Sequence, residues 1–476
     1  MKAPKRELFV AVVLGFLMLL AFSIRLDNFR KSEWQTIDEI VYYRLGSQIT
    51  RNLADYHTIP YARELMARGR DLPEYFTRPL FKHPPLFSFL ISLSIRFFGD
   101  NLESALYPSL FLGVLMIPLI YLLGLSIYDH RVGLLGALFV SLDPVSIICS
   151  QKVWMDTTVS FFMVLAVFLF IRGLKSGRDG FFVLSGLASG LAAATKYPGI
   201  LATLCVVAYA LIYRRDLFRN KGFFLGLGMP VVVLLPWFFW NYQIYGKDFL
   251  KMQGVLHSEF SRFLNFSIGL LFLGVLIVLG VGAFFLLRRL KASGPLPSFK
   301  LLARFEPEKF RNLFLVSLAV LFVFGLQRQL LHSLQIFFLP KTTWYGGAFS
   351  NEPSTFYIGR LMEFSLVYVF AFASFFIPRG QREDSGAILR ISTIVILLFF
   401  VLMRNFQSRY ILPCIPLLLL LGAKLISRFM DKVKQQKSFS LRLAGNILLA
   451  AVLFLIFAKL FFINMMLSYP NDLCYF

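Results

Sequence analysis

The stretch PPLFSFLISLSIRFFG, residues 84–99, determines how the rest of this chain is arranged. It is apolar over about fifteen residues, but it contains Arg96 and begins with Pro84-Pro85. An α-helix needs about 20 apolar residues to cross a bilayer core of about 30 Å, and shorter runs are typical of interfacial or re-entrant helices. Whether residues 84–98 cross a membrane decides on which side every later loop lies.

The composition indicates a polytopic membrane protein. The chain has 476 residues, of which 57% are hydrophobic and only 16% are charged, whereas soluble domains carry about 25% charged residues. The first apolar run follows the basic start MKAPKRE and has no small-residue cleavage site after it, so it is interpreted as an uncleaved helix. The four cysteines match neither a metal site nor a disulfide framework. The apolar runs lie near residues 8–24, 84–98, 106–127, 132–150, 156–172, 180–195, 198–213, 222–240, 265–287, 312–330, 361–377, 388–404, 409–427 and 442–466.

Loop charge favours a topology in which residues 84–98 do not cross. With the N-terminus in the cytoplasm, the cytoplasmic loops then hold about 26 Lys and Arg and the short outer loops about ten, as the positive-inside rule requires. The sequence therefore predicts an all-α, multi-pass protein of the cell (plasma) membrane with about 13 transmembrane helices. The net charge of +23 follows from this bias, and no nucleic-acid partner is expected.

The predicted organisation is one transmembrane domain over residues 1–476. The first extracytoplasmic loop, 25–105, would hold interfacial helices, and further extracytoplasmic loops would be 241–264 and 331–360. No soluble C-terminal domain is expected after the last span.

The ionisable residues of the apolar runs gather at the predicted outer ends, and the middle of the membrane is nearly free of charge. Charges inside a bilayer are costly and mark function, and a transport path would need them near the midplane. This placement favours a site at the outer membrane face. The residues are Asp38, Glu39, Lys82, His83, Lys152, Asp156, Lys196, His257, Arg262, Arg328, Arg360, Glu363, Arg404 and Arg409.

An acidic residue among cations at a lipid interface suits sugar transfer from a polyprenyl phosphate. A glycosidase needs a second carboxylic acid to protonate its leaving oxygen, but phosphate leaves as an anion and needs none. Such a site requires one carboxylate base and several cations around the phosphate. Asp38 would be the base that accepts the proton of the acceptor hydroxyl.

The order of several motifs resembles the GT-C superfamily of glycosyltransferases, in the branch of the dolichyl-phosphate-mannose-protein mannosyltransferases and the lipid A aminoarabinose transferase. DEIVYY is similar to the acidic first-loop motif, and KHPPLFSFLISLSIRFFG to the helix that closes that loop. DPVSIICSQKVWMDTTVSFF is similar to the second-loop motif, and GLASGLAAATKYPGI to the Gly-rich helix that ends in Lys. RNFQSRYILPCIPLLLLLGA is similar to the Arg-Tyr-leucine-proline signature.

The resemblance implies a fold, a reaction and a set of site residues. It implies a GT-C-like fold and an inverting transfer from a dolichyl- or undecaprenyl-phosphate sugar to a protein, glycolipid or polysaccharide acceptor. No cofactor is assigned, with a divalent metal left open. The implied site residues are Asp38 and Glu39 for catalysis, His83, Lys82, Lys196, Arg409 and Tyr410 for the donor phosphate, and Asp156, Tyr42, His257 and Arg262 elsewhere in the site.

The sequence departs from these relatives at two positions. Tyr107 stands near the place where many relatives carry Arg, and Lys82 stands where the aminoarabinose branch has an acidic residue that helps to hold a metal. Structural roles are open for several residues: Asp156 and His83 as helix caps, Lys196 as a snorkelling lysine, and Arg409 with Tyr410 as interfacial anchors. The functional alternatives are a lipid or solute transporter or flippase, a non-catalytic subunit of an envelope assembly, and a transferase of whole oligosaccharides.

Overall fold

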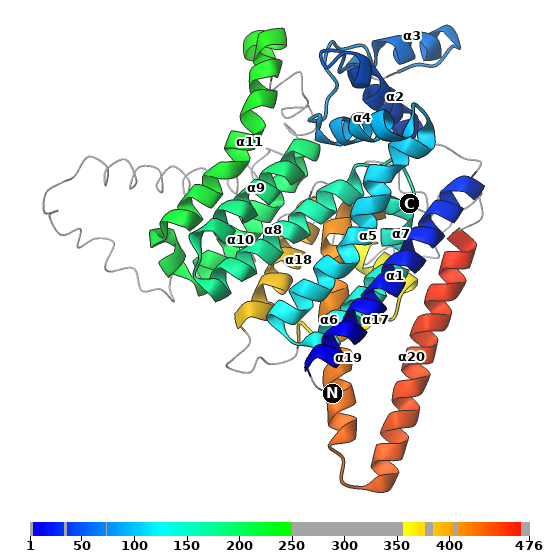
Figure 1. The fold of residues 1–476 in the computed structure, drawn as a ribbon, viewed down its shortest axis with the longest axis vertical. Helices are drawn as coiled ribbons and strands as arrows, with labels where there is room; N and C mark the ends of the chain where they lie inside the picture. The colour runs from blue at the N-terminus through cyan, green and yellow to red at the C-terminus, as the bar shows by residue number, and fades with distance from the viewer. Residues whose placement is uncertain are drawn as a thin grey trace, which may run out of the picture. The chain divides into compact units, whose positions relative to one another are not determined.

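The structure, a computed structural model, describes residues 3–32, 36–72, 74–249, 356–376, 384–402 and 407–467. Every regular element among these residues is helical (Figure 1). This confirms the predicted all-α class. Contacts group residues 1–246, 344–350 and 356–476 into one unit, while the second unit, 247–343 and 351–355, lies almost wholly outside the described residues.

Six helical segments of the described residues are long and apolar enough to cross a membrane. A seventh is a bent pair, and the runs 265–287 and 312–330 lie outside the described residues, so the expected total of 13 stays a prediction. The six segments are Lys5–Lys31, Leu102–Ile127, Asp156–Ser176, Lys221–Asp248, Ser408–Lys434 and Phe439–Phe461.

The α-helices are numbered as in Figure 1. Their bounds are α1 Ala3–Lys31, α2 Ile37–Arg51, α3 Ile59–Ala67, α4 Leu86–Phe98, α5 Leu102–Ile127, α6 His130–Leu142, α7 Pro144–Ser150, α8 Asp156–Ser176, α9 Asp179–Thr195, α10 Leu201–Tyr213, α11 Lys221–Tyr245, α16 Phe356–Phe364, α17 Val367–Ala373, α18 Asp384–Leu402, α19 Ile415–Lys434 and α20 Phe439–Leu467. Short 3-10 helices are η1 Glu74–Phe76, η2 Tyr197–Ile200, η3 Arg215–Arg219, η4 Gly246–Asp248 and η5 Ser408–Cys414.

Helix α4 is the short apolar stretch on which the predicted topology depends. Its 13 residues span about 20 Å at 1.5 Å per residue, which is less than the bilayer core. It packs against α2 and α5, and Figure 1 shows α2, α3 and α4 grouped together beside one end of α5. Ile91 is buried against Gly46 of α2, where a Cβ atom would overlap the Ile91 side chain.

Two apolar runs that the sequence presents as continuous are broken in the structure. The run 132–150 forms α6 and α7, bent by 58°, because Pro144 has no N–H to continue the helix. Asp143 caps α7 by accepting a hydrogen bond from the Ser146 N–H at 2.8 Å. The run 361–377 falls on α16 and α17, which are separated at Ser365, whose hydroxyl accepts from the Val367 N–H at 3.2 Å.

Helices α8 and α9 bring two predicted site residues to the same end of the bundle. The chain turns back after Ser176 through Gly177, whose φ of 66° closes α8 in the left-handed conformation that glycine adopts readily. The two helices then pack along each other. Asp156 at the start of α8 and Lys196 just after α9 therefore lie side by side. They stand at the end of the bundle that also holds the candidate active site.

Candidate active site at the N-terminus of α2

The first turn of α2 presents Asp38 to solvent. Thr36 and Glu39 form a capping box, in which the Thr36 hydroxyl accepts from the Glu39 N–H and the Glu39 carboxylate accepts from the Thr36 N–H. This pattern, T-x-x-E, fixes where the helix begins. Asp38 then falls in the first turn, where the helix dipole favours a negative charge. Its side chain is 47% exposed.

Arg409 contacts Asp38 directly. Its Nη1 donates to Asp38 Oδ2 at 2.8 Å, and its Nε donates to Gln407 Oε1 at 2.8 Å. The guanidinium lies 4.6 Å from the centre of the Trp154 ring and 5.3 Å from that of Tyr410. Because aromatic faces attract cations, these rings hold the guanidinium in one place beside the carboxylate.

Lys196 lies next to this pair. It follows α9, and its Nζ donates to Asp156 Oδ1 at 3.0 Å. The same ammonium is 4.2 Å from the centre of the Tyr410 ring, so Lys196 and Arg409 share one aromatic platform. Asp156 is buried and is the first residue of α8, so its carboxylate fixes the lysine at the edge of the site.

Lys82 and His83 lie between η1 and α4 and face the same charges. Burial lowers the pKa of Lys82 to about 8, although attraction to Asp38 opposes this shift. Burial and the nearby cations Lys82, Lys196 and Arg409 hold the pKa of His83 well below 6.5. The Lys82 ammonium lies 3.7 Å from the centre of the Tyr75 ring. His83 is therefore neutral at pH 7, within a set of cations.

Glu39 points away from the exposed side of the site. Its Oε2 lies 3.6 Å from the Lys152 ammonium, and both side chains are almost fully buried, with exposures of 1% and 2%. Its Oε1 accepts from the Val153 N–H at 3.4 Å. Glu39 thus joins the start of α2 to the turn between α7 and α8.

The structure brings together most of the residues that the sequence pointed to. Asp38, Lys82, His83, Lys196, Arg409, Tyr410 and Asp156 share the contacts and charge interactions above. Tyr42 is buried beneath them, where its hydroxyl lies 3.8 Å from Met155 Sδ. His257 and Arg262, with most of loops 241–264 and 331–360, lie outside the described residues.

Sequence reasoning missed Trp154. Its indole N–H donates to the Thr36 hydroxyl at 3.0 Å, and its ring lies beneath Arg409. One side chain therefore connects the cap of α2 to the guanidinium. The signal was present in the sequence, because Trp154 lies two residues before Asp156 in the second-loop motif.

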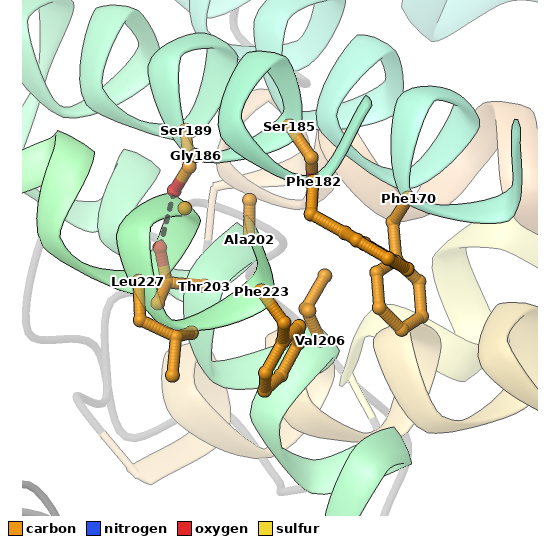
Figure 2. A pocket seen from close by; sticks show the side chains of 11 residues that line it. Phe170, Phe182, Ser185, Gly186, Ser189, Ala202, Thr203, Val206, Phe223 and Leu227 are labelled. Atoms are coloured by element: carbon orange, nitrogen blue, oxygen red, sulfur yellow. Dashed lines mark hydrogen bonds between the residues drawn. The ribbon is translucent and has the colours of Figure 1, made fainter. Parts of the chain in front are cut away.

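Two other features were considered as binding sites, a metal cluster and the cavity in Figure 2. Within the described ranges, no three His, Cys, Asp or Glu side chains gather closely enough to hold a metal ion. The cavity in Figure 2 lies among α8–α11, with Ser189 and Thr203 hydrogen-bonded at its edge. Its volume of about 10 Å³ is close to the minimum for one water molecule, so it cannot admit a sugar.

The described site has the charges needed to hold an anion beside a carboxylate. A half-exposed carboxylate faces one guanidinium and two ammonium groups, and Asp156 and Asp38 do not neutralise all three. A phosphate could take the place of water around these cations, while Asp38 accepts a proton from a hydroxyl next to it.

Comparisons with known proteins find one matching family and one related protein. Residues 82–240 match the family described as dolichyl-phosphate-mannose-protein mannosyltransferase. A protein of Aquifex aeolicus (strain VF5), described as uncharacterized, is 26% identical over 220 residues, which is 45% of this chain and 44% of that protein.

Several solved structures share the fold, and AglB and ArnT represent them. The archaeal oligosaccharyltransferase AglB from Archaeoglobus fulgidus, in complex with an inhibitory peptide and a dolichol-phosphate, has a TM-score of 0.59 at 15% identity, covering 98% of this chain and 57% of that one. ArnT from Cupriavidus metallidurans, bound to undecaprenyl phosphate, has a TM-score of 0.50 at 15% identity, covering 100% of this chain and 76% of that one.

This chain spans about half the length of the Aquifex protein and of AglB. The structural comparisons cover 98% and 100% of this chain, and the family match covers residues 82–240, about a third of it. The chain therefore has the GT-C fold that these structures share, and its residues 82–240 are similar to the dolichyl-phosphate-mannose-protein mannosyltransferase family.

Proposed function

We propose that this protein transfers a sugar from a dolichyl- or undecaprenyl-phosphate donor to an acceptor hydroxyl on the extracytoplasmic side of the membrane, with inversion. The observation that carries the proposal is the contact between Asp38 and Arg409. It places a half-exposed carboxylate 2.8 Å from a guanidinium that shares its aromatic platform with Lys196.

Asp38 acts as the general base. The acceptor hydroxyl attacks the anomeric carbon from the face opposite the phosphate, and its proton passes to a carboxylate oxygen of Asp38. The bond between the anomeric carbon and the phosphate oxygen breaks, and its electron pair leaves with the phosphate. Attack from the opposite face inverts the configuration, and no acid is needed because the leaving group is already an anion.

Arg409, Lys196 and Lys82 stabilise the phosphate as it gains negative charge. Fixed cations in a site shielded from water favour a charge that develops in the transition state. His83, which is neutral, would donate one N–H to a phosphate oxygen. These roles give each side chain of the cluster a part in holding the donor.

Arg409 also links donor binding to the base. A phosphate competes with Asp38 for the guanidinium N–H groups, and its arrival leaves a lone pair of Asp38 available to the acceptor hydroxyl. The donor would therefore bind before the acceptor. Asp156 stays with Lys196 throughout and keeps that ammonium in position.

The acceptor would be a protein, a glycolipid or a polysaccharide. AglB is an oligosaccharyltransferase whose structure is a complex with an inhibitory peptide, so the transfer of a whole oligosaccharide is tested together with that of a single sugar. The assay therefore uses two radiolabelled donors, one with a monosaccharide and one with an oligosaccharide on polyprenyl phosphate, and membrane extracts as the source of acceptor.

The test is Asp38→Asn in the purified full chain. Removal of a general base lowers the rate by about 10²- to 10⁴-fold, and we expect transfer to fall by this factor while donor binding is retained. The control is Asp100→Asn, because Asp100 is a partly exposed carboxylate that contacts Ser47 and Arg51 outside the site. Transfer at the wild-type rate by a folded Asp38→Asn protein would remove Asp38 as the base.

A further inference from the structure

An open groove of about 490 Å³ lies at the end of the bundle opposite the candidate active site. Its walls come from the last turns of α5 and α8 and the first turn of α9. The apolar lining is Leu122, Leu125, Phe168 and Phe181, and the charged lining is Arg172 and Lys175.

The charge in this groove has one sign. Arg172 and Lys175 are three residues apart on α8, so they lie on the same face of the helix. No carboxylate lines the groove. The Arg172 guanidinium lies 5.8 Å from the centre of the Phe181 ring, which holds it at the wall. The groove thus combines an apolar floor with two cations.

The position of the groove follows from the length of α8. This helix begins at Asp156, beside the candidate active site, and its 21 residues extend for about 31 Å. That length equals the thickness of a bilayer core. With α8 spanning the bilayer, Arg172 and Lys175, in its last two turns, reach the lipid headgroups of the opposite leaflet.

We propose that this groove binds one anionic phospholipid of the leaflet opposite the candidate active site. Arg172 and Lys175 hold the headgroup phosphate, and the Ser126 hydroxyl, which also lines the groove, donates to a headgroup oxygen. The acyl chains lie along Leu122, Leu125 and Phe168. Basic pockets between transmembrane helices bind anionic headgroups by this combination of charge and apolar contact.

Native mass spectrometry of the full chain measures this lipid directly, without reference to glycosyl transfer. The protein is released from nanodiscs that contain phosphatidylglycerol and phosphatidylcholine, and the retained lipid is counted. We expect one phosphatidylglycerol per chain. Each cation contributes about 1 kcal/mol to such binding, so the double variant Arg172→Ala, Lys175→Ala should bind phosphatidylglycerol about 30-fold more weakly.

Two further variants distinguish lipid binding at the groove from a general attraction of the lipid to positive charge on the protein. Lys432→Ala, Lys434→Ala removes two exposed cations of α19 that do not line the groove, and it should retain the lipid. Arg172→Lys, Lys175→Arg keeps both charges and should also retain it. If the alanine variant is poorly folded, Arg172→Gln, Lys175→Gln is measured in its place.

Three results would overturn the proposal. The groove variant retains phosphatidylglycerol as the wild type does, or the α19 variant loses it to the same extent, or phosphatidylcholine is retained equally well. The last result would show an apolar groove without headgroup selectivity.

Discussion

Asp38 and Arg409 are 371 residues apart in the sequence and 2.8 Å apart in the structure. The sequence points to each of them through the motifs that resemble the GT-C superfamily, DEIVYY for Asp38 and the Arg-Tyr-leucine-proline signature for Arg409. It does not show that they touch, because that contact depends on how η5 packs against α8. This contact is the observation on which the proposed role of Asp38 rests.

Lys82 should make donor binding depend on pH. Its pKa is lowered to about 8 by burial, so it is charged below pH 8 and becomes neutral above it. A phosphate binds the charged form, and the KM for the donor should therefore rise between pH 7 and pH 9. Lys82→Arg, which stays charged throughout, should show a flatter KM profile. A KM that falls over this range in the wild type would contradict the assignment of Lys82 to the phosphate.

Residue type alone did not separate the proposed base, Asp38, from its neighbour Glu39. Asp38 and Glu39 are adjacent, and the family pattern implies both for catalysis. In the structure only Asp38 is exposed, whereas Glu39 caps α2 and pairs with Lys152. We propose that Glu39 is a positioning residue. The sequence carried part of this information, since T-x-x-E at a helix start is a capping signal, but burial beside Lys152 depends on tertiary packing.

At the scale of elements, the start of α2 is anchored to the turn between α7 and α8. Breaking a buried ion pair leaves a charge without its partner and costs about 3–5 kcal/mol. Glu39→Gln should therefore lower stability by about this amount, because Lys152 stays buried. Glu39→Gln with Lys152→Met removes both charges and should recover much of the loss. Thermal unfolding in detergent measures both effects.

Additive losses of stability would contradict the pairing of Glu39 with Lys152. If the two single variants and the double variant show independent losses, Glu39 and Lys152 do not act as a pair. Transfer activity gives a second readout, because displacement of α2 should lower kcat more than it changes the KM for the donor. A fall in thermal stability alone would leave Glu39 with a purely structural role.

The positions of most helices were predictable from the sequence, but the interruptions within two apolar runs were not. Apolar runs located α5, α8, α9 and α20 to within about four residues at each end, because hydropathy reports which segments avoid water. The ends of α1 and α11 were missed by more, because these helices extend beyond their apolar runs. The same measure cannot see the break at Ser365, where one neutral hydroxyl replaces a helical hydrogen bond. The break at Asp143-Pro144 carried a visible signal, an N-cap residue followed by proline, which the continuous apolar run obscured.

At the scale of the whole molecule, the predicted orientation places the candidate site outside the cell. Asp100 contacts Ser47 of α2, the helix that carries Asp38. Lys432 lies in the last turn of α19. In a Cys474→Ser background, Asp100→Cys should react with a membrane-impermeant maleimide in intact cells, and Lys432→Cys only after permeabilisation. Cys149, Cys205 and Cys414 are buried and should not contribute. The opposite labelling pattern would reverse the topology.

The position of a bound lipid phosphate tests the central claim most directly. A cryo-electron microscopy structure of the full chain with a polyprenyl phosphate should show the phosphate in contact with Arg409 and Lys196, at the edge of the cluster that contains Lys82. One sugar unit should fit between that phosphate and the carboxylate of Asp38. Phosphate density at a site remote from Arg409, with Asp38 too far away for a single saccharide to reach, would contradict the account.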